Sequence, residues 1–135
     1  MKRDLVVIAA ALEVMVGAAL IAAPEFVVHL LIDASLSSGG IAVGRLGGCG
    51  LLSLGLACWP GEDDVSAQAI SALFTYNLLA AVYIGYLGTV GGFVGYLLWP
   101  ACALHALVAL LLASPAYEAG RREWPGVQFF SQIRS

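Results

Sequence analysis

Residues 5–23 read LVVIAAALEVMVGAALIAA, an apolar run that a charged residue interrupts once, at Glu13. Its length is close to the roughly 20 residues that an α-helix needs to cross the ~30 Å hydrocarbon core of a bilayer. The apolar residues are continuous rather than alternating, which favours a helix over a strand of a membrane barrel. This stretch therefore predicts a membrane-spanning helix with a carboxyl group at its middle.

The rest of the chain repeats this pattern. Three further apolar runs of similar length lie at about 40–59, 67–87 and 94–112. Hydrophobic residues make up 61% of the chain and charged residues 11%, whereas soluble domains carry about 25% charged residues. The mean hydropathy is +0.92. We therefore predict an all-α, membrane-spanning four-helix bundle over residues 1–115, followed by a cytoplasmic tail over residues 116–135.

The basic residues predict the orientation of the bundle. They precede the first run and follow the last, at Lys2, Arg3, Arg121, Arg122 and Arg134. The loops after the first and third runs contain none, so the positive-inside rule places both termini in the cytoplasm. We expect a multi-pass protein of the cell's inner (plasma) membrane. The basic start resembles that of a signal peptide, but three further spans and Glu13 favour a retained helix.

The segment between the first two runs carries Glu25, His29 and Asp33 at intervals of four. This spacing predicts an amphipathic helix at the outer interface, or a continuation of the first span with a kink at Pro24. A carboxylate, an imidazole and a carboxylate on one helix face could hold a divalent metal. A solvated polar stripe is the favoured interpretation, and no metal site is expected.

Each predicted span contains a strongly polar residue near its middle: Glu13, Arg45, Asn77 and His105. Such residues are costly in hydrocarbon, so we expect all of them to point into the bundle axis as one polar cluster. Glu13 and Arg45 are the natural pair, because a carboxylate and a guanidinium satisfy each other. Tyr76 is expected to extend the cluster, as are Tyr83 and Thr75.

Two interpretations of this polar cluster stay open. It can fix the register of the helices, as buried ion pairs often do. It can instead line a cavity that binds a ligand or handles protons, with Arg45 holding an anionic or carbonyl group. A haem with two histidine ligands would need His29 and His105, which lie at different depths. No cofactor and no catalytic residue are therefore predicted.

Small residues suggest where helices approach closely. Gly40, Gly44 and Gly48 form a stripe at intervals of four, which favours close packing within the bundle and, as the alternative, a homo-oligomer. Cys49, Cys58 and Cys102 lie in apolar runs and are interpreted as packing residues. The net charge of −3 offers no basic surface for nucleic acid.

Three stretches resemble a family of small bacterial four-helix membrane proteins. They are Gly44-Arg45-Leu46-Gly47-Gly48 with Leu54-Gly55-Leu56, then Tyr76-Asn77, and Trp99-Pro100 up to His105. The chain resembles DoxX-like proteins and their uncharacterised relatives over most of residues 5–112. The resemblance implies, for some members, a membrane subunit of a quinone-linked oxidoreductase complex.

Two functions are consistent with these observations. The first is a non-catalytic membrane subunit or binding module, part of a larger membrane complex, whose polar cluster mainly sets the fold. The alternative is a small intramembrane enzyme or carrier that acts on a lipophilic molecule such as a quinone or an isoprenoid. A cavity beside the polar cluster would favour a lipophilic ligand, and a tightly packed cluster would favour a structural role.

Overall fold

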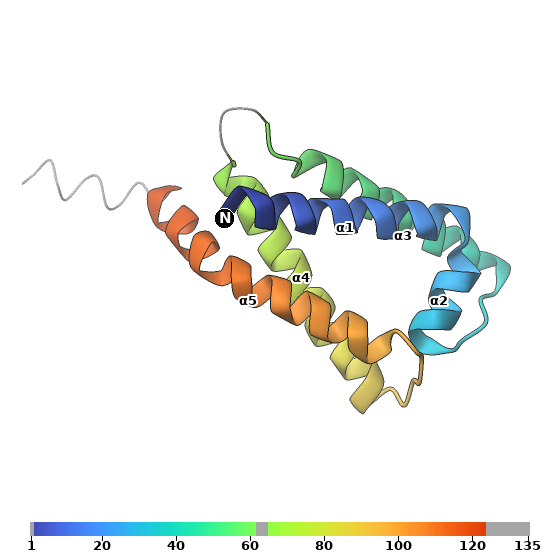
Figure 1. The fold of residues 1–135 in the computed structure, drawn as a ribbon. Helices are drawn as coiled ribbons and strands as arrows, with labels where there is room; N and C mark the ends of the chain where they lie inside the picture. Colours follow the sequence, from blue (N-terminus) through green and yellow to red (C-terminus); the bar gives the residue numbers. More distant parts are fainter. Residues whose placement is uncertain (1, 62–64, 124–135) are drawn as a thin grey trace, which may run out of the picture.

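The computed structural model describes residues 2–61 and 65–123, and every regular element in these ranges is an α-helix (Figure 1). The helices are α1 (Lys2–Ala22), α2 (Pro24–Ile32), α3 (Ser38–Ala57), α4 (Ala67–Thr89) and α5 (Leu98–Glu123). Four of them, α1, α3, α4 and the Leu98–Glu118 part of α5, are long and apolar enough to cross a membrane. The prediction of an all-α helical bundle is confirmed.

Local chemistry explains where the helices begin. The hydroxyl oxygen of Ser37 accepts a hydrogen bond from the backbone N–H of Gly40 (3.1 Å), which caps α3. Ser66 caps α4 in the same way through Ala69 (3.1 Å). Such caps satisfy N–H groups that have no partner within the helix.

The acidic residues 62–64 and the tail residues 124–135, Arg134 included, lie outside the described residues.

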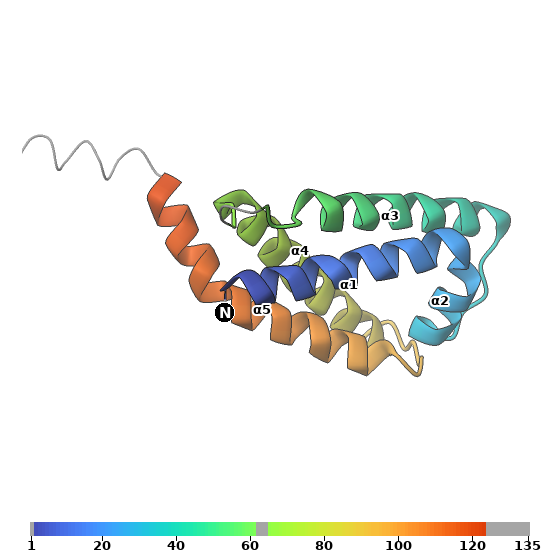
Figure 2. The ribbon, with the colours of Figure 1, turned by 45° about the horizontal axis from the view of Figure 1, so that its top comes forward.

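The fourth span differs from its prediction at both ends. α5 begins at Leu98 rather than at Val94 and continues through Pro115 to Glu123, so the first part of the predicted tail is helical. A proline inside a helix removes one backbone hydrogen bond and crowds the preceding turn, which bends the helix rather than ending it here. Figure 2 shows that α5 turns away from the bundle before its C-terminal end.

α2 is a separate short helix rather than a kinked continuation of α1. Ala23 leaves the helical conformation with φ −141° and ψ 65°, and Pro24 then occupies the first turn of α2, where its missing N–H costs nothing. The helix ends at Asp33, which adopts the left-handed conformation (φ 52°) and donates its N–H to the carbonyl of His29 (2.8 Å). The chain can therefore reverse sharply toward α3.

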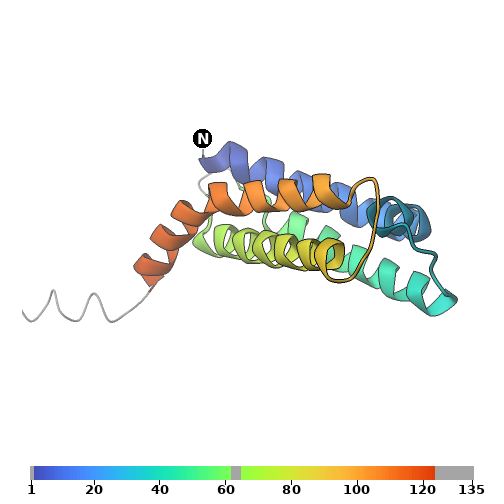
Figure 3. The ribbon, with the colours of Figure 1, turned by 90° about the horizontal axis from the view of Figure 1, so that it is seen from below.

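The spanning helices form two antiparallel pairs, α1 with α3 and α4 with α5 (Figures 1 and 3). Glycines allow α1 and α3 to approach at backbone distance. A Cβ added to Gly48 would lie 2.7 Å from the carbonyl oxygen of Gly17, and one added to Gly55 would lie 2.6 Å from that of Ala10. The register of this pair is thus set by Gly17, Gly48 and Gly55.

The two pairs share a hydrophobic core at the end of the molecule that holds the start of α1. Its buried members are Val6, Ala9, Ala10, Cys58, Ala69, Ile70, Leu73, Val108 and Leu112. Toward the other end the pairs diverge like the sides of a wedge (Figure 1), with few direct contacts of α1 to α4 or α5. We call these the narrow end and the wide end of the wedge.

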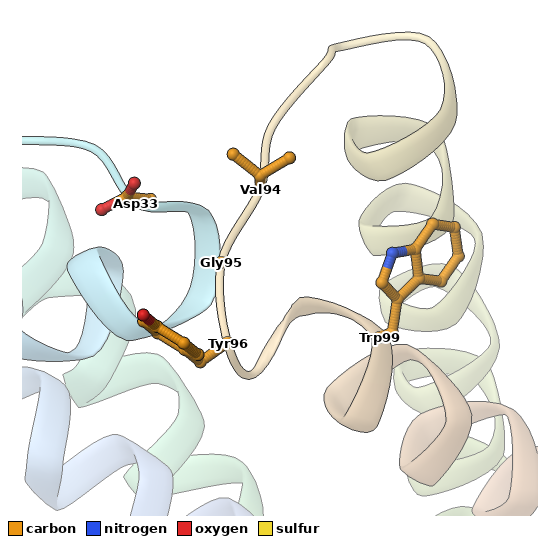
Figure 4. A pocket seen from close by; sticks show the side chains of 5 residues that line it. All are labelled: Asp33, Val94, Gly95, Tyr96 and Trp99. Carbon is orange, nitrogen blue, oxygen red and sulfur yellow. The ribbon is translucent and has the colours of Figure 1, made fainter.

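α2 bridges the wide end. The backbone N–H of Leu97, just before α5, donates to the carbonyl of Leu30 in α2 (2.9 Å). Figure 4 shows the Val94–Tyr96 segment passing beside the last turn of α2, where Asp33 lies. A Cβ on Gly95 would collide with the carbonyl group of Leu31, so this approach requires glycine. The bridge positions α2 across the opening between the two helix pairs.

Candidate functional site

A cavity of about 380 Å³ lies inside the wedge, between α1, α2, α4 and α5, with Leu51 of α3 at its edge. This volume is within the range of about 300–1,000 Å³ that is typical of small-molecule sites. The apolar part of the wall is formed by Ala9, Leu12, Val16, Leu20, Val27, Val28, Leu31, Leu51, Ile84, Leu97, Pro100, Ala101 and Leu104. Four polar side chains complete it: Glu13, Tyr76, Asn77 and His105. We call these four the polar wall.

Three residues of the polar wall form one hydrogen-bonded network at the middle of three helices. Asn77 of α4 donates from Nδ2 to Glu13 Oε1 of α1 (3.4 Å) and to the carbonyl oxygen of Leu73 (2.9 Å). Its Oδ1 lies 2.8 Å from Nδ1 of His105 in α5. Glu13 and Asn77 are each only 2% exposed. The network thus links α1 to the α4–α5 pair one turn away from the shared core.

The network also assigns the proton on the imidazole ring. The Leu73 carbonyl can only accept, so the Asn77 atom facing it must be the NH₂ group, and Oδ1 must face His105. Because Oδ1 can only accept, Nδ1 of His105 carries the hydrogen and donates it. When the ring is neutral, Nε2 is then the remaining hydrogen-bond acceptor.

Three polar atoms of the wall have no hydrogen-bond partner within the described residues. They are the second carboxyl oxygen of Glu13, Nε2 of His105 and the hydroxyl of Tyr76. No fully buried side-chain nitrogen or oxygen in the described ranges lacks a partner, so these three atoms are not sealed off, and all three residues line the cavity. Tyr76 also packs edge-on against the His105 ring, with centroids 5.8 Å apart. The polar wall therefore offers unused hydrogen-bonding capacity to the cavity.

Arg45 does not join the polar wall, and the predicted Glu13–Arg45 pair is not formed. Arg45 is exposed on α3, and Glu13 has Asn77 as its partner instead. The antiparallel register explains the difference, because Gly44 faces Pro24, which lies just beyond the end of α1. Arg45 is consequently about ten residues, or roughly 15 Å, from Glu13 along the helix axis.

Arg45→Ala is therefore expected to change the free energy of unfolding by less than about 0.5 kcal/mol, as an exposed substitution without a buried partner does. Reversible unfolding of the purified protein in mixed detergent micelles measures this change. A decrease of about 3 kcal/mol or more in the free energy of unfolding, the usual cost of leaving a buried charge without its partner, would instead support the predicted Glu13–Arg45 ion pair.

The other residues predicted for the polar cluster and for the glycine stripe also lie only partly where they were expected. Thr75 and Tyr83 are exposed, Tyr83 by 63%, and neither lines the cavity. In the glycine stripe, Gly48 packs on the backbone of α1, whereas Gly44 meets the Pro24 side chain and Gly40 meets Leu36. Only part of the predicted stripe therefore serves close packing of two spanning helices.

Sequence reasoning missed the contribution of α2 to the cavity. Val27, Val28 and Leu31 line it, whereas the sequence predicts for this segment an amphipathic helix at the outer interface or a continuation of the first span. The signal was present in the apolar residues between Glu25, His29 and Asp33, which give α2 a second face. This apolar face is turned toward the inside of the wedge, where it forms part of the cavity lining.

The polar face of α2 forms no metal cluster. His29 Nδ1 lies 3.1 Å from Asp33 Oδ1, and no group of three potential ligands occurs in the described ranges. A second pocket of about 320 Å³ lies beside Asp33, between the Val94–Tyr96 segment and Trp99 (Figure 4). None of the residues that line it belongs to the polar wall, and the cavity of the wedge, which contains all four residues of that wall, is the candidate site.

No protein-family model, curated protein or solved structure matches the chain. The resemblance to DoxX-like proteins therefore stays a prediction. The class that the fold and the cavity define is a small all-helical protein with four helices suited to a membrane.

Proposed function

We propose that this chain is a four-span protein of the inner membrane, with both termini cytoplasmic, that binds a lipophilic small molecule. The observation that carries the proposal is the cavity of about 380 Å³ whose apolar wall ends in unpartnered polar atoms. In hydrocarbon, a polar atom without a partner is costly. A ligand with an apolar body and a polar head would cover the apolar wall and satisfy these atoms together.

The protein is proposed to act as a binding module or membrane subunit rather than as a complete enzyme. Its cavity volume lies at the low end of the usual range, so it suits a head group and the first part of a chain. The wedge leaves the remainder of a longer molecule to extend between the helix pairs into lipid. With its head group held in the cavity and its chain in lipid, such a molecule could be passed to a larger membrane complex.

A small intramembrane enzyme or carrier for a quinone or an isoprenoid is the second candidate. The observation in its favour is that an imidazole and a carboxyl group share one wall and are joined through Asn77. These are the groups that most often move protons in catalysis. Conversion of the bound molecule during incubation would separate an enzyme from a binding module.

Filling the cavity tests the proposed function. Ala101 lines the cavity, whereas Ala103, on the same helix, is exposed. Native mass spectrometry of the purified protein is expected to show a bound lipophile in the wild type and in Ala103→Phe. In Ala101→Phe its occupancy should fall by about tenfold or more, because the added ring takes the space of the ligand.

The outcomes of this experiment are distinct. Equal occupancy in Ala101→Phe and in the wild type would mean that the lipophile binds elsewhere. A wild-type protein that carries no lipophile and takes up no farnesol from lipid nanodiscs would overturn the proposed function as well. Equal thermal stability of the two phenylalanine variants would show that the difference in occupancy is not caused by unfolding.

A further inference from the structure

The hydrogen-bond acceptor His105 Nε2 of the polar wall indicates which chemical group the head of the ligand carries. This inference rests on the proposed function and concerns the chemistry of the same cavity. The bond between His105 Nδ1 and Asn77 Oδ1 (2.8 Å) leaves Nε2 as an acceptor without a partner in the described part of the chain. A charged imidazolium is costly at membrane depth, so the ring is neutral. What Nε2 lacks is a hydrogen-bond donor.

The charges around the cavity restrict the head group further. In the part of the chain that the structure describes, the cavity is lined by a carboxyl group and by no lysine or arginine. Arg45, the cation expected to bind an anionic head, is exposed and roughly 15 Å away along the helix axis. A phosphate or carboxylate head would thus be buried beside Glu13 without a counter-ion, which is strongly unfavourable.

We propose that the cavity selects an uncharged lipophile with a hydroxyl head group, and that His105 Nε2 accepts the hydrogen bond of that hydroxyl. The hydroxyl oxygen keeps its own lone pairs for a donor, and the hydroxyl of Tyr76, whose ring packs edge-on against His105 on the same wall, can supply one. Asn77 acts as a positioning residue, because it orients the imidazole without offering a free atom of its own.

Three probes with one hydrocarbon chain test this proposal: farnesol, farnesyl methyl ether and farnesyl monophosphate. Their binding to the full-length protein in nanodiscs of neutral lipid can be measured by displacement of radiolabelled farnesol. Farnesol should bind about tenfold more tightly than its methyl ether, which cannot donate. The monophosphate should bind about a hundredfold or more weakly than farnesol, because its charge has no partner.

His105→Asn provides the matched variant. The asparagine amide can still donate toward Asn77 from near the place of Nδ1, while the acceptor at the place of Nε2 is removed. The variant should keep the thermal stability of the wild type and lose the preference for farnesol over its methyl ether. The wild-type comparison of the three probes does not depend on whether this variant folds.

Each result separates this inference from the proposed function. Equal affinity for farnesol and its ether, or tight binding of the monophosphate, would overturn the hydroxyl selection while leaving the cavity as a lipophile site. Retention of the full preference in a folded His105→Asn protein would overturn the role of Nε2. Failure of all three probes, together with no bound lipophile by mass spectrometry, would overturn both proposals.

Discussion

Gly48→Ala is expected to lower the free energy of unfolding by about 1–3 kcal/mol, the usual cost of overpacking a tight contact. A Cβ at this position would lie 2.7 Å from the carbonyl oxygen of Gly17 and 2.9 Å from the backbone nitrogen of Ile21. Both neighbours are backbone atoms, so the contact cannot be relieved by rotating a side chain. α1 and α3 would have to move apart along their shared face.

Gly47 provides the control for this substitution. It is the preceding residue of the same helix, and a Cβ there would meet nothing within 4 Å. Gly47→Ala should leave the free energy of unfolding unchanged or raise it by up to about 1 kcal/mol, since alanine favours a helix more than glycine does. Unfolding in mixed detergent micelles compares the two variants. Equal effects at both positions would show that the α1–α3 contact is not close.

Asn77→Leu is expected to have the other large effect, a loss of about 2–4 kcal/mol in the free energy of unfolding. The change leaves the Nδ1 hydrogen of His105 and Oε1 of Glu13 without partners, and each buried polar group so stranded costs about 1–3 kcal/mol. Binding of farnesol should be lost as well, because His105 is no longer held in one orientation.

Thr75→Leu is the control for Asn77→Leu. Thr75 lies on the same helix two residues away and is exposed, so its replacement should change stability by less than about 0.5 kcal/mol. The same unfolding measurement applies to both. Wild-type stability in Asn77→Leu would show that the network contributes little, as some hydrogen bonds within membranes do.

Much of the fold could be predicted because apolar run length is a strong signal in a chain of this composition. The helical spans were predicted to within a few residues, apart from the ends of α5. There, the fourth span was predicted to end at about residue 112 and the bundle at residue 115, but α5 continues past Pro115 to Glu123 with a bend (Figure 2). A proline removes one hydrogen bond of a helix, and whether the helix ends or bends depends on what it packs against.

The candidate site was predictable in part. Glu13, Asn77 and His105 meet as expected, because residues at the middle of three spans lie at one depth. Arg45 was placed wrongly, because the prediction assumed that the centres of all four helices lie at one depth. The actual register of α3 follows from Gly17, Gly48 and Gly55, of which Gly17 and Gly55 carry no signal in the predicted stripe of Gly40, Gly44 and Gly48.

The cavity could not be predicted from apolar runs. It exists because the buried core occupies the narrow end and because α2 bridges the wide end. Both facts depend on how two helix pairs meet, which apolar composition does not encode. The apolar residues of α2 showed that it needed a partner, but not that the partner was the lining of a ligand site.

The placement of the shared core has a mechanical consequence. From Ala10 to Ala22, α1 extends beyond the core by about 18 Å, so a rotation of roughly 10° about the narrow end displaces its far end by about 3 Å. Each helix pair can thus rotate as a rigid unit about the tightly packed core at the narrow end. The hydrogen bond between Leu97 and Leu30 spans the two helix pairs at the wide end. This bond and the close packing of Gly95 against Leu31 therefore hold the two pairs together at the end where such a rotation would move them most.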